Sequence, residues 1–366
     1  MEQVRVELGQ RGYTISVGAG MLAGSLEAGL AALQPTSVHV VTHPSLWRTW
    51  SGSLGPTVSG SEPILLRPGE RHKHLGAAAS ILGELAERRA DRQCVVVALG
   101  GGVVGDVAGF AAACYLRGVR FVQAPTTLLA QVDASAGGKT GVDLRQGKNL
   151  VGAFHQPSAV VIDTQTLATL PARHMRSGMA EILKHGIIAD EAYFEFVTSR
   201  RTGRWRPLPD WLEPVIAQSC RIKAHVVSQD EREGGLRAIL NFGHTVGHAI
   251  ETLTGYRQFS HGEAVAVGMV AAALVSERVC GAPAGLVRRV VDGLTAYGLP
   301  WSLPESCSDD EIVRVAMHDK KTSGGILRMA LTPGVGHATV MPVDALVLLD
   351  ALRCHRALRP SGNVHG

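Results

Sequence analysis

Residues 94–106 read CVVVALGGGVVGD, an apolar run that stops at three consecutive glycines. Apolar β-forming residues without alternation predict a strand that is buried on both faces, as in a parallel sheet. Gly100, Gly102 and Gly105 fit the pattern G-x-G-x-x-G, in which a turn lets backbone N–H groups approach a pyrophosphate at the start of a helix. Such turns are also common without a ligand. The stretch therefore predicts an α/β unit and leaves a dinucleotide site as one of two interpretations.

The composition bounds the class of protein. A chain of 366 residues exceeds the size at which a single core keeps growing, so two domains are expected. Six cysteines without CxxC spacing argue against a disulfide framework or a thiolate zinc site. A net charge of +4 without a basic tract favours a small anionic ligand over nucleic acid. Neither a membrane span nor a signal peptide is indicated, and a cytoplasmic location is expected.

Strand and helix patterns alternate from the start to about residue 170. After an N-terminal strand pair with its turn near Arg11, short strands are expected at 37–42, 62–66, 94–99, 120–124 and 159–163. Helices are expected at 77–89 and 106–117. Such alternation is typical of βαβ units, so residues 1–170 are predicted to form a Rossmann-like domain with a mostly parallel sheet.

The pattern changes beyond Pro171. Ala-, Val-, Leu- and Ile-rich segments predict helices at 177–188, 214–230, 246–253, 262–279 and 284–297. Because β signals are scarce there, residues 171–358 are predicted to form a mainly α-helical domain. The tail, residues 359–366, has little to bury and is expected to be disordered.

Two lysines stand among glycines toward the end of the first half. The segment Gly137–Gly141 (GGKTG) is similar to the end of a P-loop, but Asp133 stands where the first glycine is required, so a nucleotide triphosphatase is disfavoured. Lys139 and Lys148 in such loops suit a phosphate or a carboxylate. Solvated loop lysines are the alternative.

Three histidines stand out in the helical half. His244 and His248 are four residues apart and share a helix face, like the paired histidines of zinc proteases, although the intervening Glu is missing. Spacing alone pairs these two as metal ligands, with His261 or a carboxylate completing a zinc site. The alternative is that each histidine satisfies hydrogen bonds in the core. Glu181, an acid in an apolar helix, needs a cation or a metal.

Seven longer motifs identify a family resemblance. They are GGGVVGDVAGFAAA from 100, YLRGVRFVQAPTTLLAQVDASAGGKTG from 115, GKNLVGAFHQP from 147, GMAEILKHGII from 178, DEREGGLRAILNFGHTVGHAIE from 230, HGEAVAVGM from 261 and DKKTSGG from 319. From about residue 4 to 336 the chain resembles the 3-dehydroquinate synthases, which are sugar-phosphate cyclases. The resemblance implies a Rossmann-like domain followed by a helical domain, usually in a homodimer with its active site in the interdomain cleft.

The resemblance also implies a reaction. It is the conversion of 3-deoxy-D-arabino-heptulosonate 7-phosphate to 3-dehydroquinate and phosphate in the shikimate pathway of aromatic amino acid biosynthesis. Bound NAD⁺ takes a hydride from C5, which acidifies the neighbouring hydrogen and permits elimination of phosphate. Re-reduction, ring opening and an intramolecular aldol step follow. A divalent metal, Zn²⁺ or Co²⁺, acts as the Lewis acid.

Site residues follow from the resemblance and revise the pairing made from spacing. The implied metal ligands are Glu181, His244 and His261, and His248 becomes an acid/base residue together with Glu233. Implied cofactor contacts are Glu70, Lys73, Gly101, Gly102, Val103, Asp106, Thr126, Thr127, Lys148, Thr166, Leu167, Ala168 and Thr169. Implied substrate contacts are Asp133, Lys139, Asn149, Lys184, Lys223, Arg237, Asn241, one of Lys320 and Lys321, and Arg117, which reaches the phosphate of the neighbouring subunit.

Three rival functions remain open. A 2-deoxy-scyllo-inosose synthase shares the fold, NAD and metal, but its substrate lacks the carboxylate that Arg237 and Asn241 suit. An iron-type polyol dehydrogenase usually has Lys at the position of Gly109. A non-catalytic NAD-binding regulator is disfavoured by the intact charged groups. One departure from the family pattern is His43-Pro44, which replaces an acidic residue often found near the adenosine ribose.

Overall fold

The computed structural model describes residues 1–200, 205–318, 322–323 and 326–358 of the chain. It contains two compact units, Met1–Met175 with Trp205–Arg232, and Arg176–Arg204 with Glu233–Gly366. Both units are discontinuous in sequence, whereas the sequence predicts two continuous domains divided at residue 170. The cofactor-binding and metal-binding roles of those domains stay a prediction. Lys320, Lys321 and the tail 359–366 lie outside the described residues.

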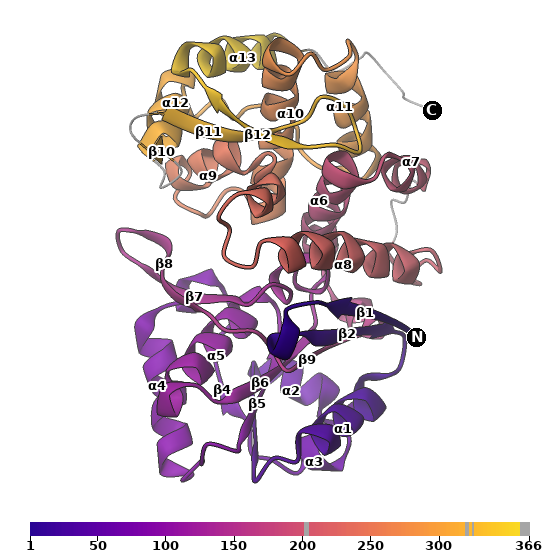
Figure 1. Cartoon of the computed structure of the whole chain (residues 1–366), viewed down its shortest axis with the longest axis vertical. Coiled ribbons are helices and arrows are strands. Elements are labelled where there is room, and N and C mark those ends of the chain that lie inside the picture. Colours follow the sequence, from indigo (N-terminus) through magenta and orange to yellow (C-terminus); the bar gives the residue numbers. More distant parts are fainter. Residues whose placement is uncertain (201–204, 319–321, 324–325, 359–366) are drawn as a thin grey trace. The chain divides into compact units, whose positions relative to one another are not determined.

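The first unit is built on a seven-stranded sheet in the order β1-β2-β9-β6-β5-β3-β4 (Figure 1). β1 and β2 are antiparallel, and every other neighbouring pair in this sheet is parallel. The mostly parallel sheet predicted from the sequence is therefore confirmed. The strands are β1 (Glu2–Val6), β2 (Tyr13–Gly18), β3 (Val38–Thr42), β4 (Ile64–Leu65), β5 (Val95–Gly100), β6 (Arg120–Pro125) and β9 (Ala159–Asp163).

Helices cover both faces of this sheet because β5 is apolar on both sides. Val96 and Ala98 pack with Ile81 of α4 in one cluster, and Val95 and Val97 pack with Leu26 of α1 in another. The helices are α1 (Leu22–Leu33), α2 (Pro44–Trp50), α3 (Pro56–Ser59), α4 (Leu75–Glu87) and α5 (Gly102–Cys114). Helix α5 begins four residues before the expected start at 106, because the glycine turn itself forms its first turn.

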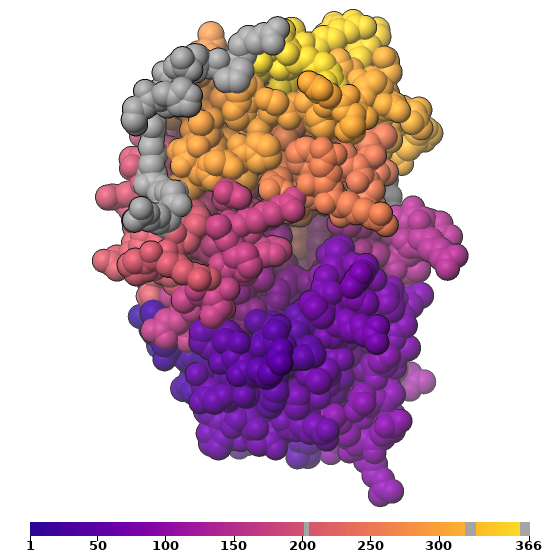
Figure 2. All heavy atoms as spheres, turned by 180° about the vertical axis from the view of Figure 1, so that it is seen from behind, coloured from indigo at the N-terminus to yellow at the C-terminus, as the bar shows by residue number. Residues whose placement is uncertain are grey.

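Two further elements complete the first unit. Helix α8 (Leu212–Gln229), expected in the helical half, packs on β1 and β2, and Figure 2 shows the N-terminal part of the chain, indigo to purple, as one closely packed body of atoms. The segments around Lys139 and Lys148, expected as loops, form an antiparallel hairpin of β7 (Lys139–Leu144) and β8 (Gly147–Phe154). Their many glycines suggested loops, whereas here glycines from the two strands face each other across the hairpin, at Gly141 and Gly152.

The second unit is a helical assembly around α10. That helix packs against α9, α11 and α13, and most of its side chains are buried. The helices are α6 (Ala172–Ala189), which starts in the first unit, α7 (Glu191–Ser199), α9 (His244–Leu253), α10 (His261–Val279), α11 (Leu286–Ala296), α12 (Asp309–His318) and α13 (Ala345–Ala357). The mainly helical character predicted for this part is confirmed. No helix of the described residues has the length and apolarity needed to traverse a bilayer.

The second unit also contains a small sheet that the sequence analysis did not predict. An antiparallel sheet joins β10 (Thr322–Ser323), β11 (Ile326–Leu331) and β12 (Thr339–Val343). In β11, Leu327, Met329 and Leu331 are buried and Arg328 is exposed. This partial alternation of buried and exposed residues is a strand signal. It is short and follows a charged, glycine-containing segment, and the neighbouring sequence has a stronger helical pattern.

Candidate active site

The first candidate site follows the carboxyl ends of three neighbouring parallel strands. Gly101, Gly102 and Val103 follow β5, Thr126 and Thr127 follow β6, and residues 164–169 follow β9 as a short 3₁₀ helix. In open α/β sheets, ligands bind at this edge because the loops there surround a crevice. The predicted cofactor residues that lie far apart in sequence are thus brought to one edge of one sheet.

The glycine turn is packed too closely to hold side chains of its own. A Cβ on Gly100 would lie 2.6 Å from Val104 Cγ2, and one on Gly101 would lie 2.9 Å from Thr127 Cγ2. Helix α5 starts here without an acidic residue in its first turn. The buried hydroxyl Oγ1 of Thr126 also has no hydrogen-bond partner among the described residues. A close backbone, a helix N-terminus and an unsatisfied hydroxyl together suit an anionic group.

A buried ion pair connects a neighbouring segment to α5. Lys73, only 5% exposed, places Nζ 2.6 Å from Asp106 Oδ2 and 2.5 Å from Asn149 Oδ1. Burial acts to lower the pKa of Lys73, but the nearby carboxylates, Asp106 above all, outweigh it and raise that pKa above its usual value. Lys73 therefore stays charged, and Asp106 keeps a partner.

Other predicted contacts of the first unit divide into paired and exposed groups. Lys148 Nζ lies 3.3 Å from Glu70 Oε1, and Lys223 Nζ lies 2.5 Å from Asp133 Oδ1. Lys139 is exposed on β7, and Arg117 is exposed in a turn where Leu116 and Arg117 both have positive φ. Of the residues after β9, Thr166 and Leu167 are buried, and Ala168 and Thr169 are exposed.

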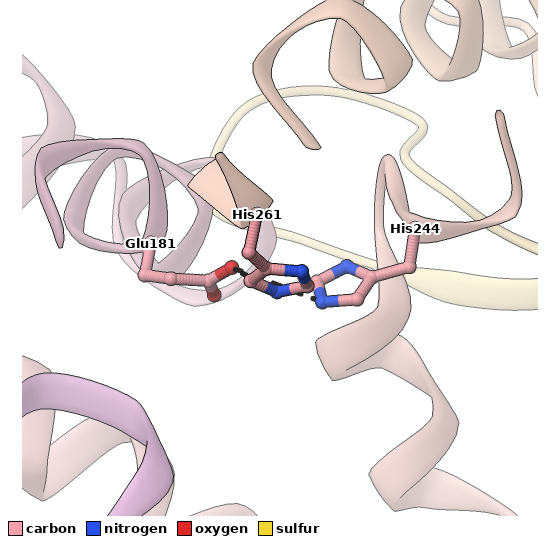
Figure 3. A group of neighbouring side chains, drawn as sticks. All are labelled: Glu181, His244 and His261. Atoms are coloured by element: carbon pink, nitrogen blue, oxygen red, sulfur yellow. Dashed lines mark ion pairs between the residues drawn. The ribbon is translucent and has the colours of Figure 1, made fainter. Parts of the chain in front are cut away.

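The second candidate site gathers three side chains from three helices of the second unit. Figure 3 shows Glu181 of α6 pointing toward His244 and His261, which begin α9 and α10. Glu181 Oε1 lies 3.8 Å from His244 Nε2 and 3.6 Å from His261 Nε2. Each of the three residues offers one ligand atom, and these atoms lie within 4.8 Å of one another.

This arrangement fits a divalent cation. Glu181 is fully buried, and its Oε1 accepts no hydrogen bond from the described residues. Its other oxygen, Oε2, pairs with the buried Lys184 Nζ. Nitrogen and oxygen ligands of a tetrahedral zinc ion lie about 3.4 Å from one another, close to the two distances observed. Two imidazoles and a carboxylate with one position left for another ligand are the donor set of a catalytic zinc site.

Glycines fix the ligand-bearing helices at backbone contact. A Cβ on Gly243, next to His244, would lie 2.8 Å from Val265 O of α10. A Cβ on Gly262, next to His261, would collide with Ser177 O of α6. Gly268 faces Gly243 O in the same way. Because backbone atoms of neighbouring helices meet at these glycines, the backbone limits how the ligand-bearing residues can move apart or together.

His248 lies beside this group rather than within it. Its ring centroid is 5.3 Å from that of His244 and 6.1 Å from that of His261. Among the described residues, no group of three possible ligands contains both His244 and His248, so the pairing from helical spacing alone is not what the fold assembles. Shared helix faces align two side chains, but a third ligand has to arrive from another helix.

A second polar cluster precedes α9. Asn241 Nδ2 donates to Glu233 Oε1 at 2.6 Å, and Arg237 is 2% exposed. Glu233 has a φ of 60°, a backbone conformation that non-glycine residues rarely adopt. The sequence analysis did not identify Glu251, a buried carboxylate close to these histidines. The signal that could have indicated it is an acidic residue three positions after His248 on an apolar helix face.

Comparisons with known proteins cover nearly the whole chain. The model "3-dehydroquinate synthase N-terminal" matches residues 63–177, and "3-dehydroquinate synthase C-terminal" matches residues 178–322. The 3-dehydroquinate synthase of Teredinibacter turnerae is 46% identical over 357 residues, covering 96% of this chain and 99% of the relative. That of Pelobacter propionicus is 44% identical over 358 residues, covering 95% and 98%.

Solved structures of related cyclases share the fold. A 2-deoxy-scyllo-inosose synthase complexed with carbaglucose-6-phosphate, NAD⁺ and Co²⁺ has a TM-score of 0.85 at 28% identity, covering 96% of this chain and 99% of its own. A 2-epi-5-epi-valiolone synthase from Streptomyces hygroscopicus subsp. jinggangensis, with NAD⁺ and Zn²⁺ bound, also has a TM-score of 0.85 at 28% identity, covering 94% and 97%. A probable glycerol dehydrogenase from Sinorhizobium meliloti, at 19% identity and a TM-score of 0.66, shares the fold alone.

Proposed function

The chain belongs to the 3-dehydroquinate synthase family, and from this premise we propose that it converts 3-deoxy-D-arabino-heptulosonate 7-phosphate to 3-dehydroquinate and phosphate. In enzyme classification this is a carbon–oxygen lyase. The single observation that carries the proposal is the convergence of Glu181, His244 and His261 in a chain with this family membership. An acid and two imidazoles facing one point have little use in a protein that only binds a nucleotide.

Two cofactors are part of the proposal. Glu181, His244 and His261 would hold Zn²⁺ or Co²⁺, and the glycine turn at the start of α5 would hold NAD⁺. When bound, NAD⁺ accepts and returns a hydride at C5 of the substrate, and the metal polarises the oxygen on that carbon. The cations found in the two related cyclases, Co²⁺ and Zn²⁺, support this choice of metal.

The chain's own groups bind the nucleotide and keep it oriented. The N-terminus of α5 and the Thr126 hydroxyl suit the pyrophosphate, because both offer donors that the fold leaves unsatisfied. Lys73 and Lys148 hold Asp106 and Glu70, which fixes the segment beside the turn. Because the reaction has no net redox change, the same nucleotide must stay bound from the first hydride transfer to the second.

Proton transfer is assigned to the histidine beside the metal ligands. We propose that His248 takes the proton from the hydroxyl that is oxidised and later returns one when the ketone is reduced. It lies one helical turn after His244, which supports this role because a base must reach the oxygen that the metal polarises. Glu233, held by Asn241, is proposed as the second proton-transfer group.

Substrate recognition needs several cations because the substrate carries a phosphate and a carboxylate. Arg237 suits the carboxylate through its two parallel donors, and the lysines suit the phosphate as point charges. The proposed set is Asp133, Lys139, Asn149, Lys184, Lys223, Arg237 and Asn241, with Lys320 or Lys321 from outside the described residues. Losing one such contact is expected to cost about 2–4 kcal/mol in the transition state.

We further propose a homodimer in which Arg117 reaches the phosphate bound to the other subunit. Its support is the exposed side chain and the left-handed backbone at Leu116 and Arg117. Non-glycine residues adopt that conformation at a cost of about 1 kcal/mol or more, and the surrounding structure must maintain it. Equilibrium sedimentation tests the dimer, and mixing Arg117→Ala with an otherwise inactive variant tests the shared site by complementation.

The decisive experiment is a phosphate-release assay with the heptulosonate phosphate, with and without NAD⁺ and with zinc, cobalt or a chelator. We expect release that needs NAD⁺, stops after chelation and returns with either metal. Turnover of glucose 6-phosphate in place of the heptulosonate phosphate would assign the chain to the inosose-forming cyclases. Net NADH from a simple alcohol would favour a dehydrogenase, and unchanged turnover after His261→Ala would contradict metal catalysis altogether.

A further inference from the structure

A buried carboxylate without an assigned role lies against one of the proposed metal ligands. Glu251 stands near the end of α9 and is 3% exposed. Its Oε2 lies 3.3 Å from Nδ1 of His261, which begins α10. A carboxylate at this depth needs a partner that compensates for its lost hydration.

The two imidazole ligands are held in the same way. In His261, Nδ1 faces Glu251 and Nε2 faces Glu181 Oε1 at 3.6 Å. In His244, Nδ1 lies 3.3 Å from the carbonyl oxygen of Phe242, and Nε2 faces the same oxygen of Glu181 at 3.8 Å. Both rings thus turn Nε2 toward one point and have an acceptor behind Nδ1.

We propose that Glu251 is a positioning residue for the metal site. Its carboxylate accepts a hydrogen bond from Nδ1–H of His261, which leaves the lone pair on Nε2 and fixes the ring plane. A neutral imidazole can bind a metal through only one nitrogen when the other carries the proton. A carboxylate behind the ring also increases the basicity of the ligating nitrogen. The inference rests on the proposed function, because it presumes that a metal binds there.

The backbone explains why this carboxylate reaches His261. A Cβ on Gly247 of α9 would lie 3.1 Å from Ala264 O of α10. The two helices therefore touch close to His261, the first residue of α10. Glu251 follows one helical turn later on α9. The carbonyl oxygen of Phe242 stands behind Nδ1 of His244 as Glu251 stands behind Nδ1 of His261. A backbone carbonyl cannot be removed by substitution, whereas the carboxylate of Glu251 can.

A different reading of the same residues would make Glu251 a ligand. Glu251, His248 and His261 each offer an atom within 4.8 Å of the others and could hold a second cation. The positioning role is favoured because Nε2 of His261 already faces Glu181 Oε1. That oxygen is buried and accepts no hydrogen bond from the described residues, so it is the atom that most needs a cation. Metal stoichiometry separates the two.

The experiment measures the Kd for Zn²⁺ and Co²⁺ on the full chain, by competition with a chromophoric chelator after metal removal. We expect Glu251→Ala to raise the Kd by about 10–100-fold. Glu251→Gln keeps the shape and one acceptor oxygen, so its Kd should rise less, and it stands in if the alanine variant does not fold. The matched control is Glu277→Gln near the other end of α10, whose Oε1 accepts from the backbone N of Val287 at 3.1 Å and which should leave the Kd unchanged.

A second measurement reports the tautomer directly. Nitrogen NMR of metal-free protein, with the signals of His261 identified from the His261→Asn spectrum, should show a proton on Nδ1 in the wild type and a mixture of tautomers in Glu251→Ala. A merely structural role for Glu251 would lower the unfolding midpoint but leave the metal Kd and the tautomer unchanged.

Three results would overturn the inference. One is a Kd within twofold of the wild type in both Glu251 variants. Another is two metal ions per wild-type chain with one lost in Glu251→Gln, which would make Glu251 a ligand. The third is a wild-type chain that binds no metal, which would also defeat the metal part of the proposed function. In the first two results the function proposed above still stands.

Discussion

The two candidate sites are made from different materials. The candidate site at the end of β5 is made mostly from backbone, and glycines there pack closely against the side chains of Val104 and Thr127. The candidate site around Glu181 is made from side chains on three helices, and there glycines bring the backbones of the helices into contact. Glycines therefore meet mainly side chains at the first site and mainly backbone atoms at the second.

This difference determines how each site should respond to substitution. A backbone site depends on the segments packed around it, so damage there should act first on stability. A side-chain site depends on single donor atoms, so damage there should act first on chemistry. The following predictions test that contrast between stability and chemistry. The contrast would be weakened if a change at the side-chain site acted mainly on stability, or a change at the backbone site mainly on catalysis.

The largest effect is expected at a metal ligand. His261→Ala should lower kcat by about a thousandfold, because the polarised oxygen loses its stabilising cation. Metal content per chain should fall with it, and added metal should no longer raise the unfolding midpoint. The matched control is His174→Ala, which removes an exposed histidine from α6, the helix that carries Glu181, and should change neither quantity. Equal stability losses in metal-free and metal-loaded protein would break the contrast.

Next in size is the ion pair beside the glycine turn. Lys73→Met should lower the free energy of unfolding by about 3–5 kcal/mol, since it leaves Asp106 without the partner that lies 2.6 Å away. Adding Asp106→Asn should recover part of that loss. Urea unfolding of both variants checks this, and a single variant within 1 kcal/mol of the wild type would show that the pair does not stabilise the first unit.

A buried histidine in the second unit should make stability depend on pH. Burial lowers the pKa of His355, whose Nε2 lies 2.5 Å from Trp301 O, to about 4. The unfolded chain protonates this group near its ordinary pKa, about 6.5, so stability is complete above that value and falls as the pH drops toward 4. The loss should reach about 3 kcal/mol. Urea unfolding at several pH values should show a shallower decline for His355→Gln, and identical slopes would contradict the prediction.

The smallest effects are expected from two glycine substitutions, one at a crowded glycine and one at a glycine with open space around it. Gly262→Ala should destabilise the second unit by about 1–3 kcal/mol, because the new methyl group meets Ser177 O of a neighbouring helix. Gly83→Ala on α4, where nothing lies within 4 Å of the added Cβ, should stabilise the chain by about 0.5–1 kcal/mol. Thermal unfolding of both variants measures the difference, and shifts of the same sign would contradict it.

Much of the fold could be predicted from the sequence because its signals are local. The apolar run before Gly100 predicted a buried parallel strand, and β5 is that strand. The hairpin β7–β8 and the sheet β10–β12 could not be predicted in the same way. Their strands are short or rich in glycine, and pairing with a neighbour rather than intrinsic preference stabilises them.

The candidate metal site shows the same limit more sharply. Helical spacing connects His244 with His248, but the acid that completes the group lies on α6, 63 residues before His244 in sequence (181 to 244). Only the family resemblance suggested Glu181 as the third ligand. Glu251 was missed because an acid near a helix end is usually a solvated residue, and nothing in the sequence indicates that α10 covers it.

Helices that touch through their peptide groups have a consequence for the slowest motions of the molecule. At Gly247 and Gly268 the nearest atoms across the contact are backbone atoms, so no side-chain rotation there could open a path for water. Amide hydrogens in the facing stretches of α9 and α10 should consequently exchange with deuterium only through opening of the whole helical assembly. They would form the most protected part of the chain, and a hydrogen-exchange map should find them last.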